Sequence, residues 1–428
     1  MASNFMAKIN KIWAREILDS RGIPTVETAC QLDDGKVNVS SVPAGTSTGT
    51  HEALELRDTN NPRYLGKGVL TAVENVNNIL GPAIIGMDPI LQTDIDNKLI
   101  NLDGTENKSK YGANALLSIS EVIAKSGAAA SNKPLYWWIN SLAQSQGIKA
   151  GLVIPTPAFN MINGGQHGAG NLDFQEFHVL PASNKNFSQG LQMCAEIYLT
   201  IGQDLIRKGA IHSVGIEGGY APNLFTNADA LEVLVESIKM TKYALGRDIF
   251  LGLDAAANSF YKNGEYTIRD KSSPLDDNQL LDYYKTINQE YKLALLEDPF
   301  NEDAWDSWKK IYNELAAEIT IVGDDILATN PKRLQKAIEE KVCNGILVKP
   351  NQVGTVSETI KVIKMAKDAN WKVIVSHRSG ETNDAFIADF AVGVGANYAK
   401  FGAPARGERV AKYNRLSAIE SELRYLKL

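Results

Sequence analysis

The sequence predicts an α/β protein with a TIM-like (β/α)8 barrel in its C-terminal part and a smaller α+β domain in front of it. Short apolar runs that end on a charged residue recur along the second part, and helical patterns fill the intervals between them. The first part instead combines strand-like runs around a turn with longer helical patterns. We expect an N-terminal capping domain over residues 1–148 and a catalytic barrel over residues 149–428.

The N-terminal part shows both kinds of local pattern. Residues 25–32 and 36–42 are strand-like and flank an Asp-Asp-Gly turn. Helical patterns cover residues 68–80 and 112–130. The proline-containing stretch 154–160 marks the boundary region between the two parts.

In the C-terminal part, the charged residues that end the apolar runs follow an order: the acids come first, and two lysines around a histidine follow. In a (β/α)8 barrel the C-terminal strand ends meet at one mouth, where active sites lie. A single such charge most simply enters a solvated loop, but seven in succession indicate a functional ring. Acids there suit a hard cation such as Mg²⁺, and lysines suit proton abstraction or an anionic substrate. The runs end, in order, at Glu217, Asp254, Glu297, Asp324, Lys349, His377 and Lys400.

Composition narrows the class of protein. The formal net charge of −6 argues against a general nucleic-acid or membrane-surface binder, which is normally basic. Three cysteines far apart in the sequence fit neither a disulfide framework nor a zinc site, and are typical of a reducing compartment. The N-terminus shows no signal-peptide pattern, and no apolar run approaches the ~20 residues of a membrane span. We therefore expect a cytoplasmic protein.

Nine motifs, collinear over nearly the whole chain, resemble those of the enolase family. The resemblance implies a barrel preceded by a three-stranded meander with helices. It also implies a lyase, phosphopyruvate hydratase, which catalyses the Mg²⁺-dependent reversible dehydration of 2-phosphoglycerate to phosphoenolpyruvate in glycolysis and gluconeogenesis. The motifs are DSRG (19–22), GTSTGTHEA (45–53), NGGQHGAGNLDFQEF (163–177), GIEGGYAPN (215–223), LEDPFNED (296–303), VGDDILATNP (322–331), LVKPNQVGT (347–355), SHRSGET (376–382) and GAPARGER (402–409).

The resemblance also implies a role for each site residue. Two Mg²⁺ ions would bind per active site, the second arriving with substrate and bound with the help of Ser47. Lys349 would remove the C2 proton, and Glu217, with Glu176 beside it, would protonate the leaving hydroxyl. Asp254, Glu297 and Asp324 would hold the first Mg²⁺; Arg378 and Ser379 would bind phosphate; and His167, Gln175, His377 and Lys400 would complete the substrate shell.

These roles agree with the chemistry of the reaction. A proton next to a carboxylate is weakly acidic, and divalent metals can stabilise the resulting ene-diolate by several kcal/mol. Sites of this superfamily generally combine a Lys or His base with Mg²⁺. Lys349 must be neutral, and burial together with nearby cations would lower its pKa. Glu217 must be protonated, and the neighbouring Glu176 would raise its pKa.

Simpler interpretations remain open for individual residues. Glu176 can be an ordinary exposed strand residue, and His167 a loop histidine. Arg378 can form a surface ion pair with Asp384. His51 and His178 are interpreted as structural.

Some positions near the predicted site depart from the common family pattern and leave the catalytic rate and loop closure open. Two alternatives therefore stay in view. One is an enolase-fold paralogue of low activity with a binding or structural role; the other is a superfamily enzyme acting on a different carboxylate. The phosphate-binding run and the Ser47 loop argue against the second. The departures are Ile23, Ala44, Ile216, Asn258, Pro350, Asn383, Phe401 and Gly407.

Oligomeric state follows from the resemblance alone. Enolases are commonly homodimers, and some assemble further into octamers. Arg15 and Glu408 match family positions that pair across the dimer interface, so we expect an intersubunit ion pair between them. The small phosphorylated substrate is the other expected partner.

Overall fold

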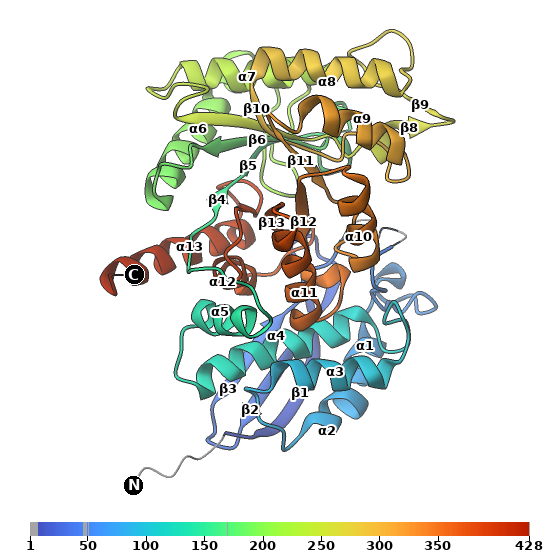
Figure 1. The fold of residues 1–428 in the computed structure, drawn as a ribbon, viewed down its shortest axis with the longest axis vertical. Helices are drawn as coiled ribbons and strands as arrows, with labels where there is room; N and C mark the ends of the chain where they lie inside the picture. The colour runs from blue at the N-terminus through green and yellow to red at the C-terminus, as the bar shows by residue number, and fades with distance from the viewer. Residues whose placement is uncertain (1–6, 46–48, 50, 169, 428) are drawn as a thin grey trace. The chain divides into compact units, whose positions relative to one another are not determined.

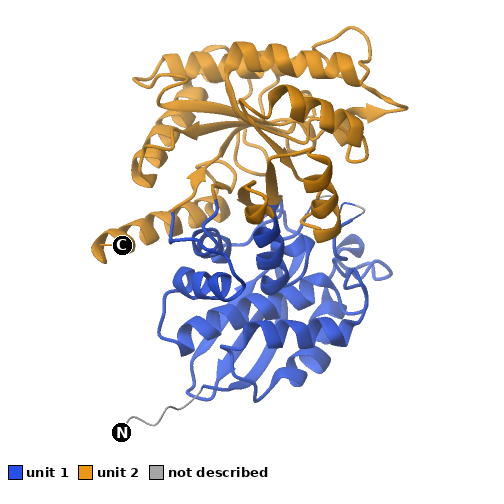
Figure 2. Ribbon diagram, viewed as in Figure 1, with its two compact units in different colours: residues 1–153, 348–365, 377–396 blue, residues 154–347, 366–376, 397–428 orange. Residues whose placement is uncertain are grey.

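The computed structural model describes residues 7–45, 49, 51–168 and 170–427, and the chain divides into two compact units (Figure 2). Unit 1 comprises residues 1–153, 348–365 and 377–396. Unit 2 comprises residues 154–347, 366–376 and 397–428. The domain boundary that we place between residues 148 and 149 stays a prediction.

Unit 1 contains an antiparallel sheet in the order β1-β2-β3 (Figure 1). Its strands are β1 (Ile9–Leu18), β2 (Pro24–Leu32) and β3 (Val37–Ser41). The turn between β2 and β3 uses Gly35 at φ +87°, a conformation that glycine adopts without a steric penalty. The three-stranded meander implied by the resemblance is thus confirmed.

Helices pack against this sheet through apolar side chains. The pattern predicted over residues 112–130 is confirmed as α4, which packs on β2 and β3 and is buried along most of its length. The pattern over residues 68–80 begins as α1 at Leu70 and continues as a π-helical turn, Val76–Leu80. The helices of unit 1 are α1 (Leu70–Asn75), α2 (Gly81–Ile84), α3 (Gln92–Asp103), α4 (Ala113–Ala130), α5 (Leu135–Ser145), α11 (Val356–Asp368) and α12 (Phe386–Gly393).

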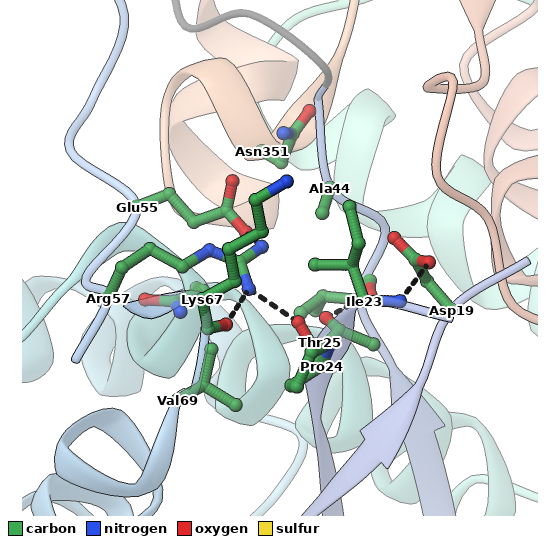
Figure 3. A network of polar contacts seen from close by, with 12 residues as sticks. Asp19, Ile23, Pro24, Thr25, Ala44, Glu55, Arg57, Lys67, Val69 and Asn351 are labelled. Carbon is green, nitrogen blue, oxygen red and sulfur yellow. Dashed lines mark hydrogen bonds and ion pairs between the residues drawn. The ribbon is translucent and has the colours of Figure 1, made fainter. Parts of the chain in front are cut away.

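A half-buried guanidinium fixes the irregular segment that follows β3. Arg57 Nη1 donates to the carbonyl of Pro24, at the start of β2, at 2.5 Å and to the carbonyl of Lys67 at 2.8 Å (Figure 3). Arg57 also forms an ion pair with Glu55. Burial raises the pKa of Glu55, and the guanidinium opposes that shift. Because one donor group satisfies a carbonyl at the start of β2 and one in the segment after β3, Arg57 ties that segment to the sheet.

A buried acid links α4 to β3 and to the segment before α12. Ser40 Oγ lies 2.9 Å from Glu121 Oε2 and 3.2 Å from Asp384 Oδ2. Lys125 Nζ contacts Asp384 Oδ2 at 2.6 Å. Burial raises the pKa of Glu121 to about 8; the charges of Asp384 and Glu381 add to this, and Lys125 opposes it.

This raised pKa predicts how stability depends on pH. An acid whose pKa is 4.5 in the unfolded chain and about 8 in the folded chain stabilises the fold fully below pH 4.5, and that contribution is lost as pH rises to 8. Glu121→Gln stays neutral, so its unfolding free energy relative to wild type should rise by a few kcal/mol over that range, at about 1.4 kcal/mol per pKa unit. Urea unfolding of both proteins at a series of pH values measures this difference. A difference independent of pH would contradict the assignment.

Unit 2 is built on a nearly closed sheet of nine strands in the order β4-β14-β13-β12-β11-β10-β7-β6-β5. β4 and β5 are separated only by Ala158. β4 pairs with β14 and β5 pairs with β6. Together the two short strands therefore count as one strand of an eight-stranded barrel. The predicted TIM-like barrel is confirmed. The strands are β4 (Thr156–Pro157), β5 (Phe159–Asn163), β6 (Glu176–Pro181), β7 (Ile249–Asp254), β10 (Leu293–Glu297), β11 (Thr320–Gly323), β12 (Gly345–Val348), β13 (Lys372–Ser376) and β14 (Tyr398–Lys400).

The barrel departs from a regular strand-helix alternation at its start. β6 runs antiparallel to both β5 and β7, and the two helices α6 and α7 follow it before β7 begins. The run predicted to end at Glu217 is not a strand: residues 211–220 form only isolated bridges, at Val214 and Tyr220. Glycines at 215, 218 and 219 weaken strand formation, so this prediction was wrong.

Helices follow most strands of the barrel. The helical patterns expected in the intervals between the apolar runs are confirmed, for example in α10 and α11. Each of α6, α7 and α8 begins with a capping box, and Asn330 caps α10. No helix in the described part of the chain is both long and apolar enough to span a membrane. The helices of unit 2 are α6 (Phe187–Arg207), α7 (Asn227–Lys239), α8 (Asp277–Tyr291), α9 (Trp305–Leu315), α10 (Pro331–Glu340) and α13 (Gly407–Tyr425).

Candidate active site

Three carboxylates meet at one rim of the barrel in unit 2. Asp254 and Glu297 are the last residues of the parallel neighbours β7 and β10, and they are register partners. Glu176 is the register partner of Asp254 on the other side. Because β6 is reversed, its first residue lies at the rim where the other strands end. All three side chains are buried.

Lys400, the last residue of β14, provides a cation for these acids. Its Nζ lies 2.9 Å from Asp254 Oδ2, 2.9 Å from Glu297 Oε2 and 3.3 Å from Glu176 Oε1. Burial alone would lower the pKa of Lys400, but the surrounding carboxylates outweigh it and raise that pKa well above its usual range. Lys400 is therefore held as an ammonium.

The acids around this ammonium are suited to a divalent cation. Burial raises the pKa of Glu297 well above its usual range, and the charges of Asp254 and Asp324 raise it further. A hard divalent cation prefers carboxylate oxygens and would relieve this repulsion. The predicted ligands Asp254, Glu297 and Asp324 therefore fit Mg²⁺ by donor type and charge.

Asp324, which directly follows β11, is positioned by an acid that sequence reasoning missed. Asp298 Oδ1 accepts the backbone N–H of Asp324 at 2.9 Å, and its Oδ2 accepts that of Asp325 at 2.8 Å. Asp298, Asp324 and Asp325 form one of the groups whose ligand atoms lie within 4.8 Å of one another. Asn258, a departure from the family pattern, donates to Asp325 Oδ2 at 2.9 Å. The only feature of the sequence that could have indicated a role for Asp298 is its position directly after Glu297, at the end of an apolar run.

Glu217 lies with Glu176 and His167 in a second such group. His167 Nδ1 is 3.4 Å from Glu217 Oε1 and 3.6 Å from Glu176 Oε1. Burial opposes the charged imidazole, but Glu217 and Glu176 outweigh it and raise the pKa of His167 to about 10. A cationic His167 thus lies between the two acids. This contact makes it more than an ordinary loop histidine.

Glu176 contacts both Lys400 and His167, and so connects the acids around Lys400 with the group of His167 and Glu217. It is 1% exposed, which excludes the interpretation as an exposed strand residue. His178 Nε2 lies 2.8 Å from Glu176 Oε2, so His178, expected to be structural, contacts the site directly. Burial and Glu217 act to raise the pKa of Glu176, but Lys400, His167 and His178 together hold it well below its usual range. Gln175 Nε2 lies 3.3 Å from Asp254 Oδ2.

The remaining predicted site residues belong to unit 1. In the chain, Lys349 directly follows β12 and His377 directly follows β13. Arg378 is buried and its Nη1 lies 2.8 Å from Glu52 Oε2 and 3.2 Å from Asn351 Oδ1. The expected alternative, a surface pair with Asp384, is wrong because Arg378 is not at the surface.

Ser379 also lies beside a guanidinium. Arg21 Nη1 is 3.4 Å from Ser379 Oγ, and Arg21 is itself paired with Asp19 at 2.7 Å. A hydroxyl and guanidinium groups of this kind are typical phosphate-binding groups. Ser47 lies outside the described residues.

A barrel whose strand ends carry buried carboxylates around an ammonium defines an α/β-barrel protein with a site suited to metal-assisted acid-base chemistry. Comparison with protein families identifies it further. Residues 9–139 match the enolase N-terminal domain, and residues 151–426 match the enolase C-terminal TIM barrel domain. The chain belongs to the enolase family, and we regard it as an enzyme of the enolase superfamily.

Proposed function

We propose that this protein is a phosphopyruvate hydratase, which removes water reversibly from 2-phosphoglycerate to give phosphoenolpyruvate. The observation that carries the proposal is the buried cluster of Asp254, Glu297 and Glu176 around Lys400. Such a cluster concentrates charge where a carboxylate substrate and a divalent cation would bind together. The family match supports the same reaction.

Asp254, Glu297 and Asp324 would hold a first Mg²⁺, and Ser47 would contribute to a second that arrives with substrate. When bound, Mg²⁺ supplies positive charge that stabilises the ene-diolate form of the substrate. Lys400 keeps its own charge next to the same acids. It therefore limits the repulsion between them whether or not the metal is present.

Lys349 acts as the base, and Glu217 as the acid. The Lys349 amine takes the proton from C2, and the electron pair of the C–H bond is left on the substrate as the ene-diolate. That pair then forms the C2–C3 double bond as the C3–O bond breaks, and Glu217 gives its proton to the departing hydroxyl to make water. His167 and His178 orient Glu176 beside Glu217.

Arg378 and Ser379 bind the substrate phosphate in this proposal. His377 and Gln175 belong to the rest of the substrate shell. Arg378 is already oriented by Glu52 and Asn351. A guanidinium held in this way loses little conformational freedom on binding an anion.

The direct test is turnover of 2-phosphoglycerate by the purified protein with Mg²⁺, followed by the ultraviolet absorbance of the product. Activity should vanish with a chelator and return when Mg²⁺ is restored, since the acids alone cannot stabilise the ene-diolate. Glycerate without its phosphate is the control substrate. No turnover by folded, Mg²⁺-loaded protein would exclude this function and favour a binding or structural role; turnover of glycerate instead would indicate a different superfamily reaction.

We further propose that the protein is a cytoplasmic, glycolytic enzyme that forms a homodimer or an octamer built from dimers. The intersubunit pair between Arg15 and Glu408 stays a prediction. Within the chain Arg15 pairs with Glu27 at 2.6 Å and keeps 71% of its side chain exposed, while Glu408 pairs with Arg406 at 2.8 Å. Sedimentation of wild type and Glu408→Gln would test the pair: a dimer that weakens in the variant supports it.

A further inference from the structure

We infer that Asn160 is a positioning residue for the Glu217 carboxyl group. This inference rests on the proposed function, in which Glu217 is the acid. Asn160 lies on β5, is 0% exposed, and its Nδ2 donates to Glu217 Oε2 at 3.0 Å. No motif singled it out, because its role depends on what the barrel places against β5.

The backbone around Glu217 is held against β5 by close contact. A Cβ at Gly219 would lie 3.0 Å from the carbonyl oxygen of Asn160 and 2.8 Å from Asn163 Oδ1. A Cβ at Gly215 would lie 2.8 Å from Asn163 Oδ1. Side chains at these two positions would therefore push the segment away from the strand. Glycine here brings the Glu217 carboxyl within reach of the Asn160 amide.

The backbone of this segment is also fixed from other elements of unit 2. The carbonyl of Glu217 accepts the N–H of Ala403 at 3.0 Å, and the carbonyl of Gly218 accepts the hydroxyl of Tyr198 at 2.7 Å. The side-chain torsions of Glu217 are then the main freedom left, and the bond from Asn160 restricts them. A positioned acid requires this restriction, because proton transfer needs the carboxyl within hydrogen-bond distance of the leaving oxygen.

A carboxamide N–H is suited to this role because it is a donor whatever the protonation state of Glu217. Asn160 Nδ2 pairs with Oε2 of the carboxylate that remains after proton delivery. In the protonated acid, Oε2 is the carbonyl oxygen and still accepts from Nδ2, so the proton lies on Oε1 and stays available for the leaving hydroxyl. Asn160 can thus hold the carboxyl group in both of its states.

The test separates removal of the C2 proton from loss of the hydroxyl. Exchange of the C2 proton with deuterated solvent reports the Lys349 step, and product formation reports both steps. Asn160→Leu should lower product formation about tenfold or more while changing exchange much less, since an acid contributes about 10²–10⁴-fold to its own step. The ratio of exchange to product formation should therefore rise in Asn160→Leu, and it should rise in Glu217→Gln as well.

Asn163→Leu is the matched control. Asn163 lies on the same strand, is 1% exposed and packs on the same glycines, and its amide has no hydrogen-bond partner among the described residues. It should leave the ratio unchanged. Leu has nearly the shape of Asn, so the variants should fold; Asn160→Ser is the second variant.

Three outcomes would overturn the inference: an unchanged ratio in folded Asn160 variants, an equal rise in Asn163→Leu, or unfolding of both Asn160 variants, which would make the residue structural. Circular dichroism and thermal unfolding establish whether each variant is folded. Absence of turnover in the wild-type protein is a different result. It would overturn the proposed function, and this inference with it.

Discussion

Replacing Lys349 by Ala should lower turnover of 2-phosphoglycerate by about 10³- to 10⁴-fold while the thermal unfolding temperature stays close to that of wild type. The proposal assigns Lys349 the removal of a weakly acidic C2 proton, and water is a poor substitute for a positioned amine. Steady-state kinetics measures the turnover. Loss of C2 proton exchange in deuterated solvent would show that the missing step is proton removal itself.

Lys372→Ala is the matched control for Lys349→Ala. Lys372 is exposed and is the first residue of β13, whereas Lys349 comes directly after the last residue of β12. The two lysines therefore occupy opposite strand ends. It should keep full activity. Retained turnover in Lys349→Ala would mean that another group is the base. If Lys349→Ala lost all turnover but kept the function that the protein has in the cell, the protein would be better interpreted as a binding paralogue.

Replacing Lys400 by Met should destabilise the metal-free protein strongly and make its stability depend on Mg²⁺. The change leaves Asp254, Glu297 and Glu176 buried without the ammonium that contacts all three. Loss of one partner of a buried ion pair costs about 3–5 kcal/mol. Mg²⁺ should restore part of this loss, because a ligand that binds only the folded state stabilises it by an amount that grows with the logarithm of its concentration divided by Kd.

Thermal unfolding with Mg²⁺ and with a chelator measures this effect. The rise in unfolding temperature on adding Mg²⁺ should be larger for Lys400→Met than for wild type. Lys412→Met is the control, since Lys412 is a buried lysine on α13 that donates to the carbonyl of Glu408 at 2.9 Å. It should lose stability without gaining a response to Mg²⁺. An equal Mg²⁺ response in Lys400→Met and wild type would contradict the prediction.

Much of the site in unit 2 could be predicted from local sequence. Asp254 and Glu297 end strands, and Asp324 follows one, because each comes after a short apolar run with no competing helical period. Adjacent strand ends in a parallel barrel then bring such residues together. The run before Glu217 shows the limit of this reasoning, since three nearby glycines made it a loop.

Other site residues carry no local signal. His178 and Asn160 lie inside strands where their neighbours are apolar, and in the sequence they resemble buried structural residues. Asn160 contacts Glu217 across 57 positions of the chain. Such contacts depend on which segments pack together, and this sequence has no repeated pattern that would indicate them.

The sequence by itself determined the family, the barrel and the charged residues at its strand ends, because apolar periodicity and collinear motifs are local properties of the chain. Only the tertiary structure decided which of those charges neutralise one another. The reversal of β6 brings Glu176 to the rim beside Asp254, and β14 then delivers Lys400 to both. Strand direction and register are set by packing over the whole barrel, so the pairing of these charges could not be predicted from any one segment.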